Sequence, residues 1–259
     1  MLIFRFEWKR KRKYILIWAA TLAVCIFSMT PVYYGMIETV ETLPVEFTQG
    51  GFFETVGISL ELLMEPLGMY SFLTGFFMVA GGIFGMHLGL SLHTEECTGN
   101  TAEYLYTKPC GRKQIYMGKL LCALAGICVT GIFYLATSFL TMTLFRFGFP
   151  IGEFFLVAGS FILISLFFAL LGLMVGIFHP NNRSPLLTVF VEYCITSFSR
   201  TVNIRAIGFL SPFSFFSPAE IHNAGTYSWD YMLWYLLLLF GFALLAYWKI
   251  LKRDIALAV

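Results

Sequence analysis

The sequence predicts an all-α integral membrane protein, a single domain of residues 1–259 with six transmembrane helices. Three observations lead to this fold class. Hydrophobic residues make up 58% of the chain and charged residues only 12%, about half the charged share of soluble domains. Apolar runs of about 20 residues recur, and a helix of that length crosses the hydrocarbon core of a bilayer. The short alternating segments typical of membrane β-barrels do not occur in the sequence.

The first span is expected over residues 14–34. Residues 1–13 precede it and combine six bases with Phe4, Phe6 and Trp8. This composition is typical of an amphipathic helix that lies at the membrane surface and contacts lipid. The apolar run is too long for the core of a secretory signal peptide, which has about 7–15 residues. An N-terminal amphipathic helix followed by a span is therefore predicted.

The next three spans are expected over residues 70–92, 115–145 and 154–178. The first and last of these carry glycines four residues apart, at Gly81, Gly85 and Gly89 and at Gly172 and Gly176. Small residues at this spacing lie on nearly one helix face and let another helix approach closely. The pattern does not distinguish a contact within one subunit from a contact between subunits.

The last two spans are expected over residues 184–198 and 231–251. Glu192 lies in the middle of the first of them and is the acid placed deepest in any predicted span. A carboxylate there is costly unless it faces water, a partner or a proton. It therefore marks a substrate path, pairs structurally with Arg200 or Lys119, or lies near a membrane interface because the span is shifted. Residues 203–230 are apolar but broken by prolines, which predicts an external re-entrant or surface-lying element.

The distribution of charge predicts the orientation. Residues 35–69 carry six glutamates and no lysine or arginine, which suggests an external loop. With both termini in the cytoplasm, 14 of the 17 lysines and arginines fall on the inner side. The positive-inside rule favours this arrangement, so we expect a multi-pass protein of the cell membrane with an even number of spans.

The most polar interval runs from Glu95 to Lys119 and lies between two spans. It carries Glu95, Glu96 and Glu103 and then Lys108, Arg112, Lys113 and Lys119. Pro109 ends any helix before it, which leaves about two helical turns over residues 100–107. So short a helix is not stable alone in water and needs a partner surface. That surface is either the ends of the membrane helices or a separate protein.

Several kinds of site are not supported by the residues. Gly118-Lys119 is followed by leucine and lacks the upstream glycine of a phosphate-binding loop. His93, Cys97 and Cys110 match no common zinc spacing. Glu95-Glu96 near His87 and His93 resembles an intramembrane metalloprotease motif, but capping by Thr94 of a helix that starts there explains the acids more simply. We predict no catalytic residue, no metal site and free cysteine thiols.

The chain resembles the membrane subunits of ABC-2 type transporters, in particular exporter permeases of the sodium, antibiotic and bacteriocin-immunity kind. The resemblance covers nearly the whole chain and includes a Leu-Ser-Pro-Phe element at residues 210–213 and Lys-Arg-Asp at 252–254. The loop motif that carries it is Glu96, Gly99, Thr101, Glu103, Leu105, Thr107, Lys108, Pro109, Arg112 and Lys119.

What the resemblance implies is a permease that dimerises with a second copy or a paralogue and docks a separate ABC ATPase. ATP and Mg would bind to that ATPase, and no cofactor to this chain. The loop would form a coupling helix whose contacts are made by Glu95, Glu96, Gly99, Glu103, Pro109 and Arg112. Lipid is a further expected partner and nucleic acid is not.

Two other functions stay open from the residues. A non-transporting membrane scaffold or sensor would have the same hydropathy. A stand-alone secondary transporter is the other, although that class usually shows internal repeats and charges in several spans. The substrate is not indicated, because the few polar groups in the spans suit an amphiphile and an ion equally.

Overall fold

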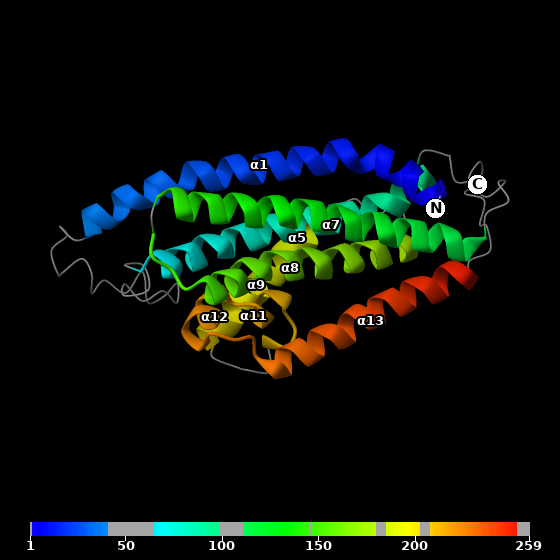
Figure 1. Ribbon diagram of the computed structural model, residues 1–259. Helices are drawn as coiled ribbons and strands as arrows, with labels where there is room; N and C mark the ends of the chain where they lie inside the picture. Colours follow the sequence, from blue (N-terminus) through cyan, green and yellow to red (C-terminus); the bar gives the residue numbers. More distant parts are fainter. Residues whose placement is uncertain are drawn as a thin grey trace.

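The computed structural model describes residues 2–40, 65–98, 111–145, 147–179, 185–202 and 208–252. These ranges are helical and contain no strand, so the all-α prediction is confirmed. The helices form an elongated bundle (Figure 1). They are α1 (Leu2–Val40), α5 (Pro66–Thr98), α7 (Arg112–Leu144), α8 (Ile151–Phe178), α9 (Pro185–Val202), α11 (Pro212–Phe215), α12 (Pro218–Ala224) and α13 (Trp229–Lys252).

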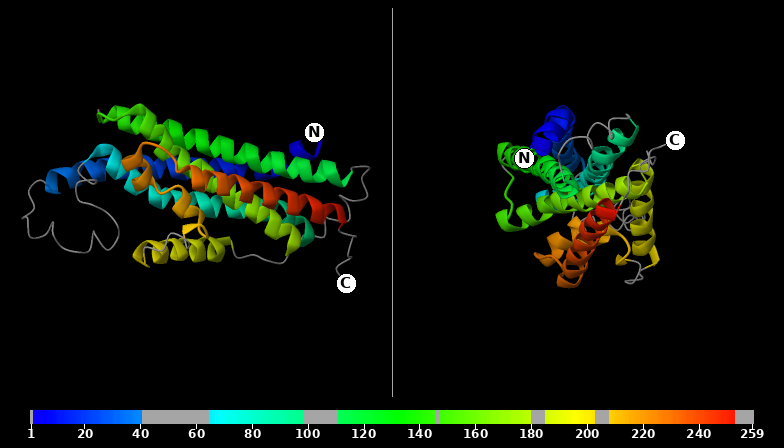
Figure 2. Two further views of the ribbon diagram at one scale, coloured as in Figure 1. Left: turned by 90° about the horizontal axis from the view of Figure 1, so that it is seen from below. Right: turned by 90° about the vertical axis from the view of Figure 1, so that its right-hand side faces the viewer.

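Two ends of the bundle can be distinguished. One end of the bundle holds the start of α1 and the last turns of α5, α8 and α13 (Figures 1 and 2). We call it the terminal end. α5 and α8 begin at the opposite end, which we call the far end. Lys249 and Lys252, in the last turn of α13, lie at the terminal end together with the basic start of α1.

Five described helices are long and apolar enough to cross a membrane, namely α1, α5, α7, α8 and α13. The prediction of six such spans therefore holds only in part. The exception is residues 184–198, where α9 is apolar over Pro185–Phe198 only. α8 and α13 run in the same direction (Figure 1), so the chain between them must return along the bundle. α9, with 18 residues and so about 27 Å long, is the longest described helix between them.

A separate N-terminal amphipathic helix does not form, which corrects the prediction for residues 1–13. α1 runs unbroken from Leu2 to Val40, because its first turns are rich in lysine and arginine, which are good helix formers, and contain no glycine or proline. These turns lie against α7, where Gly118 makes room for them. A Cβ built on Gly118 would lie only 2.8 Å from Cγ2 of Ile3. The basic segment is thus an extension of the first membrane helix.

α5 and α8 form the closest helix pair of the bundle, and all five predicted packing glycines lie in it. Cβ atoms built on Gly85, Gly89 and Gly172 would lie 2.2, 2.0 and 2.4 Å from backbone oxygens of the facing helix. A Cβ atom built on Gly81 would lie 2.6 Å from a ring atom of Phe161, and one built on Gly176 would lie 3.0 Å from a backbone oxygen. The glycines therefore serve a contact within one subunit.

α11 and α12 lie at the far end, in the segment for which a re-entrant or surface element was expected. Pro218 begins α12, and Gly225, with φ of 65°, ends it in the left-handed conformation that glycine adopts without strain. Nε2 of His222 on α12 lies 3.1 Å from a carboxylate oxygen of Glu65, and Nδ1 lies 3.5 Å from one of Glu153. These contacts connect α12 to the residue before α5 and to the first turn of α8.

Candidate functional site

Six charged side chains gather at the terminal end, between α1, α5 and α7. They are Glu7, Arg10 and Lys11 of α1, Glu95 and Glu96 of α5, and Lys119 of α7. With three acids and three bases, this ionic network is formally neutral. A buried set of charges has to balance, because removing an unpaired charge from water costs several kcal/mol.

Lys119 is the centre of the network and is completely buried. Its Nζ lies 2.5 Å from Oε2 of Glu96 and 3.8 Å from Oε1 of Glu7, whose side chain is also fully buried. Nζ donates a further hydrogen bond to the backbone oxygen of Leu92. One ammonium group thus joins the end of α5 to both α1 and α7.

The outer part of the network is formed by two bases of α1. Nζ of Lys11 lies 2.5 Å from Oε1 of Glu95. Nη2 of Arg10 lies 2.7 Å from Oε2 of Glu7, and its Nε lies 3.6 Å from Oε2 of Glu95. The side chain of Glu95 keeps 46% of its surface exposed, so it is the acid of the network that a partner can reach.

The sequence spacing explains the α1 side of the network. Glu7, Arg10 and Lys11 are three and four residues apart and therefore share one helix face. Ile3 and Ile15, one turn before and two turns after, are buried on the same face. The apolar residues thus set the rotation of α1 and so point the charges inward.

The α5 side differs from the prediction. Thr94 does not cap a new helix at Glu95, because α5 continues to Thr98 and Oγ1 of Thr94 donates a hydrogen bond to the backbone oxygen of Leu90. Glu95 and Glu96 therefore lie in the last turn of a helix, where the macrodipole disfavours acids. The ammonium group of Lys119, which contacts both Glu96 and Leu92, offsets this effect.

Arg112 lies at the other side of the polar loop, at the first residue of α7. Its Nη1 donates a hydrogen bond of 2.9 Å to the backbone oxygen of Leu251 in α13. The last carbonyl groups of a helix lack partners within the helix, and a cation is favourable beside them. Four residues along α7, the hydroxyl group of Tyr116 donates to the backbone oxygen of Ala243 at 2.8 Å. α7 and α13 are thereby joined at the terminal end.

The six expected coupling residues fall into three groups: the end of α5, the start of α7, and the residues outside the described part of the chain. Glu95 and Glu96 end α5 and belong to the ionic network, and Glu96 is only 3% exposed. Arg112 begins α7 and binds α13. Gly99, Glu103 and Pro109 lie outside the described residues. The structure thus describes both borders of the expected coupling segment.

Glu192, the expected substrate-path residue, is half-buried on α9. Its Oε2 is buried and accepts no hydrogen bond from the described residues. Pairing with Lys119 does not occur, because Lys119 is held by Glu96, and the side chain of Arg200 lies outside the described part. The backbone oxygen of Glu192 accepts a hydrogen bond of 2.9 Å from Oγ of Ser211. This bond fixes the residue before α11 to α9.

Comparison with known proteins supplies the family. The family model described as "ABC-2 family transporter protein" matches residues 1–255, almost the whole chain. The chain belongs to the ABC-2 transporter family. No curated protein matches it at a significant level. As an ABC-2 transporter protein with several membrane-spanning helices, it is a multi-pass membrane component of a transporter.

In this ABC-2 transporter chain, a buried group of hydroxyls lies between α5 and α7 toward the far end. The hydroxyl group of Tyr70 lies 3.2 Å from that of Tyr134, and Oγ1 of Thr74 lies 3.3 Å from the latter. The group could not be predicted from the sequence, because its members are single polar residues of apolar spans. Only the packing of α5 against α7 brings their hydroxyl groups together.

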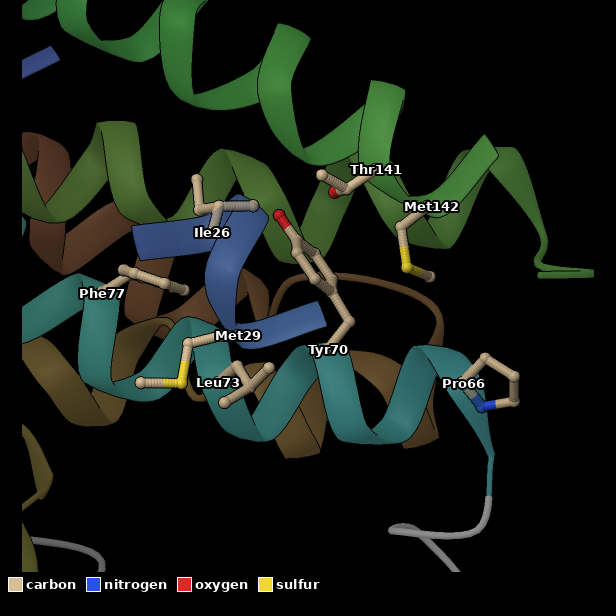
Figure 3. A pocket seen from close by; sticks show the side chains of 8 residues that line it. All are labelled: Ile26, Met29, Pro66, Tyr70, Leu73, Phe77, Thr141 and Met142. Atoms are coloured by element: carbon tan, nitrogen blue, oxygen red, sulfur yellow. The ribbon is translucent and has the colours of Figure 1, made fainter. Parts of the chain in front are cut away.

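A small hollow adjoins these hydroxyls (Figure 3) and is lined by Ile26, Met29, Pro66, Tyr70, Leu73, Phe77, Thr141 and Met142. The side chain of Tyr70 reaches from α5 toward Thr141 on α7. The volume of about 20 Å³ has room for about one water molecule.

No group of three or more histidine, cysteine or acidic side chains among the described residues is arranged to hold a metal ion. Cys25, Cys122, Cys128 and Cys194 are free thiols. Cys97 and Cys110, which were considered as ligands together with His93, lie outside the part whose side chains are described.

Proposed function

We propose that this chain is the permease subunit of an ABC exporter, and that it couples ATP hydrolysis by a separate ATPase subunit to the efflux of a substrate across or out of the membrane. One observation carries the proposal beyond family membership. The segment expected to meet the ATPase lies between two borders, and each border is bonded to other helices of the bundle.

The first border is the end of α5, where Glu95 and Glu96 bind Lys11 of α1 and Lys119 of α7. The second is Arg112, which binds the last turn of α13. A force on the segment between these borders would act on α1, α5, α7 and α13 together. Such a connection is what a coupling element needs, because the ATPase can only drive transport by moving membrane helices against one another.

The distribution of charge supports the proposed orientation. The terminal end carries the bases of α1, of the start of α7 and of the end of α13, and the positive-inside rule favours a cytoplasmic position for such an end. We place the protein in a bacterial plasma membrane with both termini inside. ATP and Mg would then bind to the cytoplasmic ATPase and not to this chain.

The second protein partner in this proposal is another permease subunit, either a copy or a paralogue. α13 has large apolar side chains exposed along its length, among them Leu237, Phe240 and Leu244, and these can face lipid or a second permease. Glu192 is the candidate for the substrate path, since its carboxylate has a buried oxygen without a hydrogen-bond donor among the described residues. The sodium, antibiotic and bacteriocin-immunity kind remains the proposed sub-type.

The test is affinity purification of the tagged chain in a mild detergent, followed by mass spectrometry of what comes with it. We expect an ATPase with a phosphate-binding loop of its own, and ATP turnover by that ATPase that changes when the permease is present. Recovery of the chain alone in several detergents would contradict the proposal and favour a scaffold, a sensor or a secondary transporter.

A further inference from the structure

The outward face of α1 at the terminal end carries only positive charge. Four bases on it are exposed, namely Arg5, Lys9, Arg12 and Lys13. None of them forms an ion pair with a described residue, and the one acid among residues 2–13, Glu7, points into the ionic network. The bases recur at three- and four-residue intervals, so they form one stripe about 12 Å long, from Arg5 to Lys13.

This basic stripe continues directly into a surface that faces lipid. One turn beyond Lys13 the same helix face presents Leu16 and Ile17, which are 51% and 65% exposed, and further on Val24, at 68%. In a helix long and apolar enough to cross a membrane, such exposed apolar side chains are stabilised by contact with hydrocarbon. The change from bases to apolar residues therefore marks the level at which headgroups meet acyl chains.

The stripe cannot rotate away from the membrane. On the opposite face of α1, Ile3 packs against Gly118, while Glu7 and Lys11 are held by Lys119 and Glu95. The charges of this inward face form ion pairs within the subunit. The charges of the outward face are available to a partner.

We propose that the outward face of α1 from Arg5 to Lys13 binds the anionic headgroups of membrane lipids at the terminal end. A polybasic face at a membrane surface attracts acidic lipids, and each base near the surface contributes about fivefold in affinity. This binding is independent of the proposed transport function.

The height of the stripe along the bundle favours lipid over the ATPase. α1 and α7 both start at the terminal end and run in the same direction (Figure 1), and Glu7 lies beside Lys119. Lys13 is six residues deeper than Glu7, while Lys113 is six residues further out than Lys119. Along the helices these steps are about 9 Å each. The stripe is thus on the flank of the bundle at headgroup level, and the tip that a cytoplasmic ATPase approaches is formed by other residues.

The experiment measures lipid binding to the delipidated full-length chain in detergent by native mass spectrometry. The probes are dioleoyl phosphatidylglycerol, which is anionic, and dioleoyl phosphatidylcholine, which is zwitterionic. We expect tighter binding of the anionic lipid, weakened by salt because exposed charges are screened. The variant K9Q/K13Q should bind the anionic lipid about 25-fold more weakly, and the matched variant K113Q/K252Q should bind it like the wild type.

Three outcomes would overturn the proposal. The wild type could bind both lipids equally at low salt, a result that does not depend on any variant being folded. The two double variants could lose the same affinity, which would mean that total charge matters and the stripe does not. K9Q/K13Q could keep its lipid affinity but lose a co-purifying ATPase, which would assign the stripe to a protein partner.

Discussion

Lys119 of α7 and Glu96 of α5 form an ion pair in which Nζ and Oε2 are 2.5 Å apart and both side chains are buried. Glu7 of α1 shares the same ammonium group. Replacing Lys119 alone would leave the buried carboxylates of Glu7 and Glu96 without their shared cation.

We therefore expect Lys119→Met to destabilise the protein strongly, by about 3–5 kcal/mol, as is usual when one partner of a buried pair is removed. The double variant Glu96→Gln with Lys119→Met should recover much of this loss, because it removes one acid with the base. Thermal unfolding in detergent, followed by size-exclusion chromatography, measures both. An unchanged midpoint for Lys119→Met would mean that the ionic network does not hold α1, α5 and α7 together.

A second prediction concerns Arg112, which joins the border of the coupling segment to α13. Arg112→Ala removes a charged hydrogen bond to Leu251, of a kind that contributes about 1.5–3 kcal/mol. We expect stimulation of the partner ATPase to fall about tenfold or more, with insertion into the membrane intact. Lys113→Ala, which removes the neighbouring exposed base, is the control and should change little. Equal effects of the two variants would argue for a general charge effect.

The third prediction is that Gly89→Ala disrupts the α5–α8 contact. The new Cβ would lie 2.0 Å from the backbone oxygen of Ala169, which cannot turn aside as a flexible side chain can. The helices must separate, and we expect a loss of about 1–3 kcal/mol in stability. Gly75→Ala on the same helix is the control, because its Cβ would meet nothing within 4 Å. Thermal unfolding of both should show a lower midpoint for Gly89→Ala alone.

The fourth prediction concerns Glu192 on α9. If its carboxylate lies on the substrate path, Glu192→Gln should lower transport about tenfold or more, which corresponds to about 1.4 kcal/mol, without lowering expression or the unfolding midpoint. The control is Glu220→Gln, which changes an exposed acid at the far end. Transport assays in vesicles that hold permease and ATPase measure the difference. Normal transport by the Glu192 variant would assign the residue a structural role.

The sequence predicted much of the fold because membrane spans are set by local composition. The bounds predicted from hydropathy for α5, α7, α8 and α13 lie within about four residues of the candidate membrane spans, whereas the start predicted for the first span, residue 14, lies well inside the span Ile3–Met29 of α1. Hydropathy also predicted a membrane span over residues 184–198, where the apolar part of α9 is shorter than in the five candidate spans. The change from basic to apolar composition at Tyr14 predicts two elements, whereas α1 is one helix there. Helix continuity depends on backbone propensity, and that does not change there.

The candidate site was predictable only in its residue types. Glu95, Glu96 and Arg112 were singled out by the loop motif. The involvement of Glu7, Arg10 and Lys11 could not be read from the sequence, because these residues are more than 80 positions away from Glu95 and look like ordinary members of a basic N-terminal segment. Which charges face inward depends on how α1 rotates against α7, and Gly118 and the buried isoleucines set that rotation.

By itself, then, the sequence determined the all-helical membrane class, the positions of the long spans and the loop motif that led to the ABC-2 family, since these depend on composition and on neighbours along the chain. Only the tertiary structure decided that the packing glycines join α5 to α8, that Lys119 binds acids from two other helices, and that Arg112 binds the end of α13. The physical reason is that close packing and charge pairing are settled between helices. They require residues far apart in the chain to meet at one height and on facing sides.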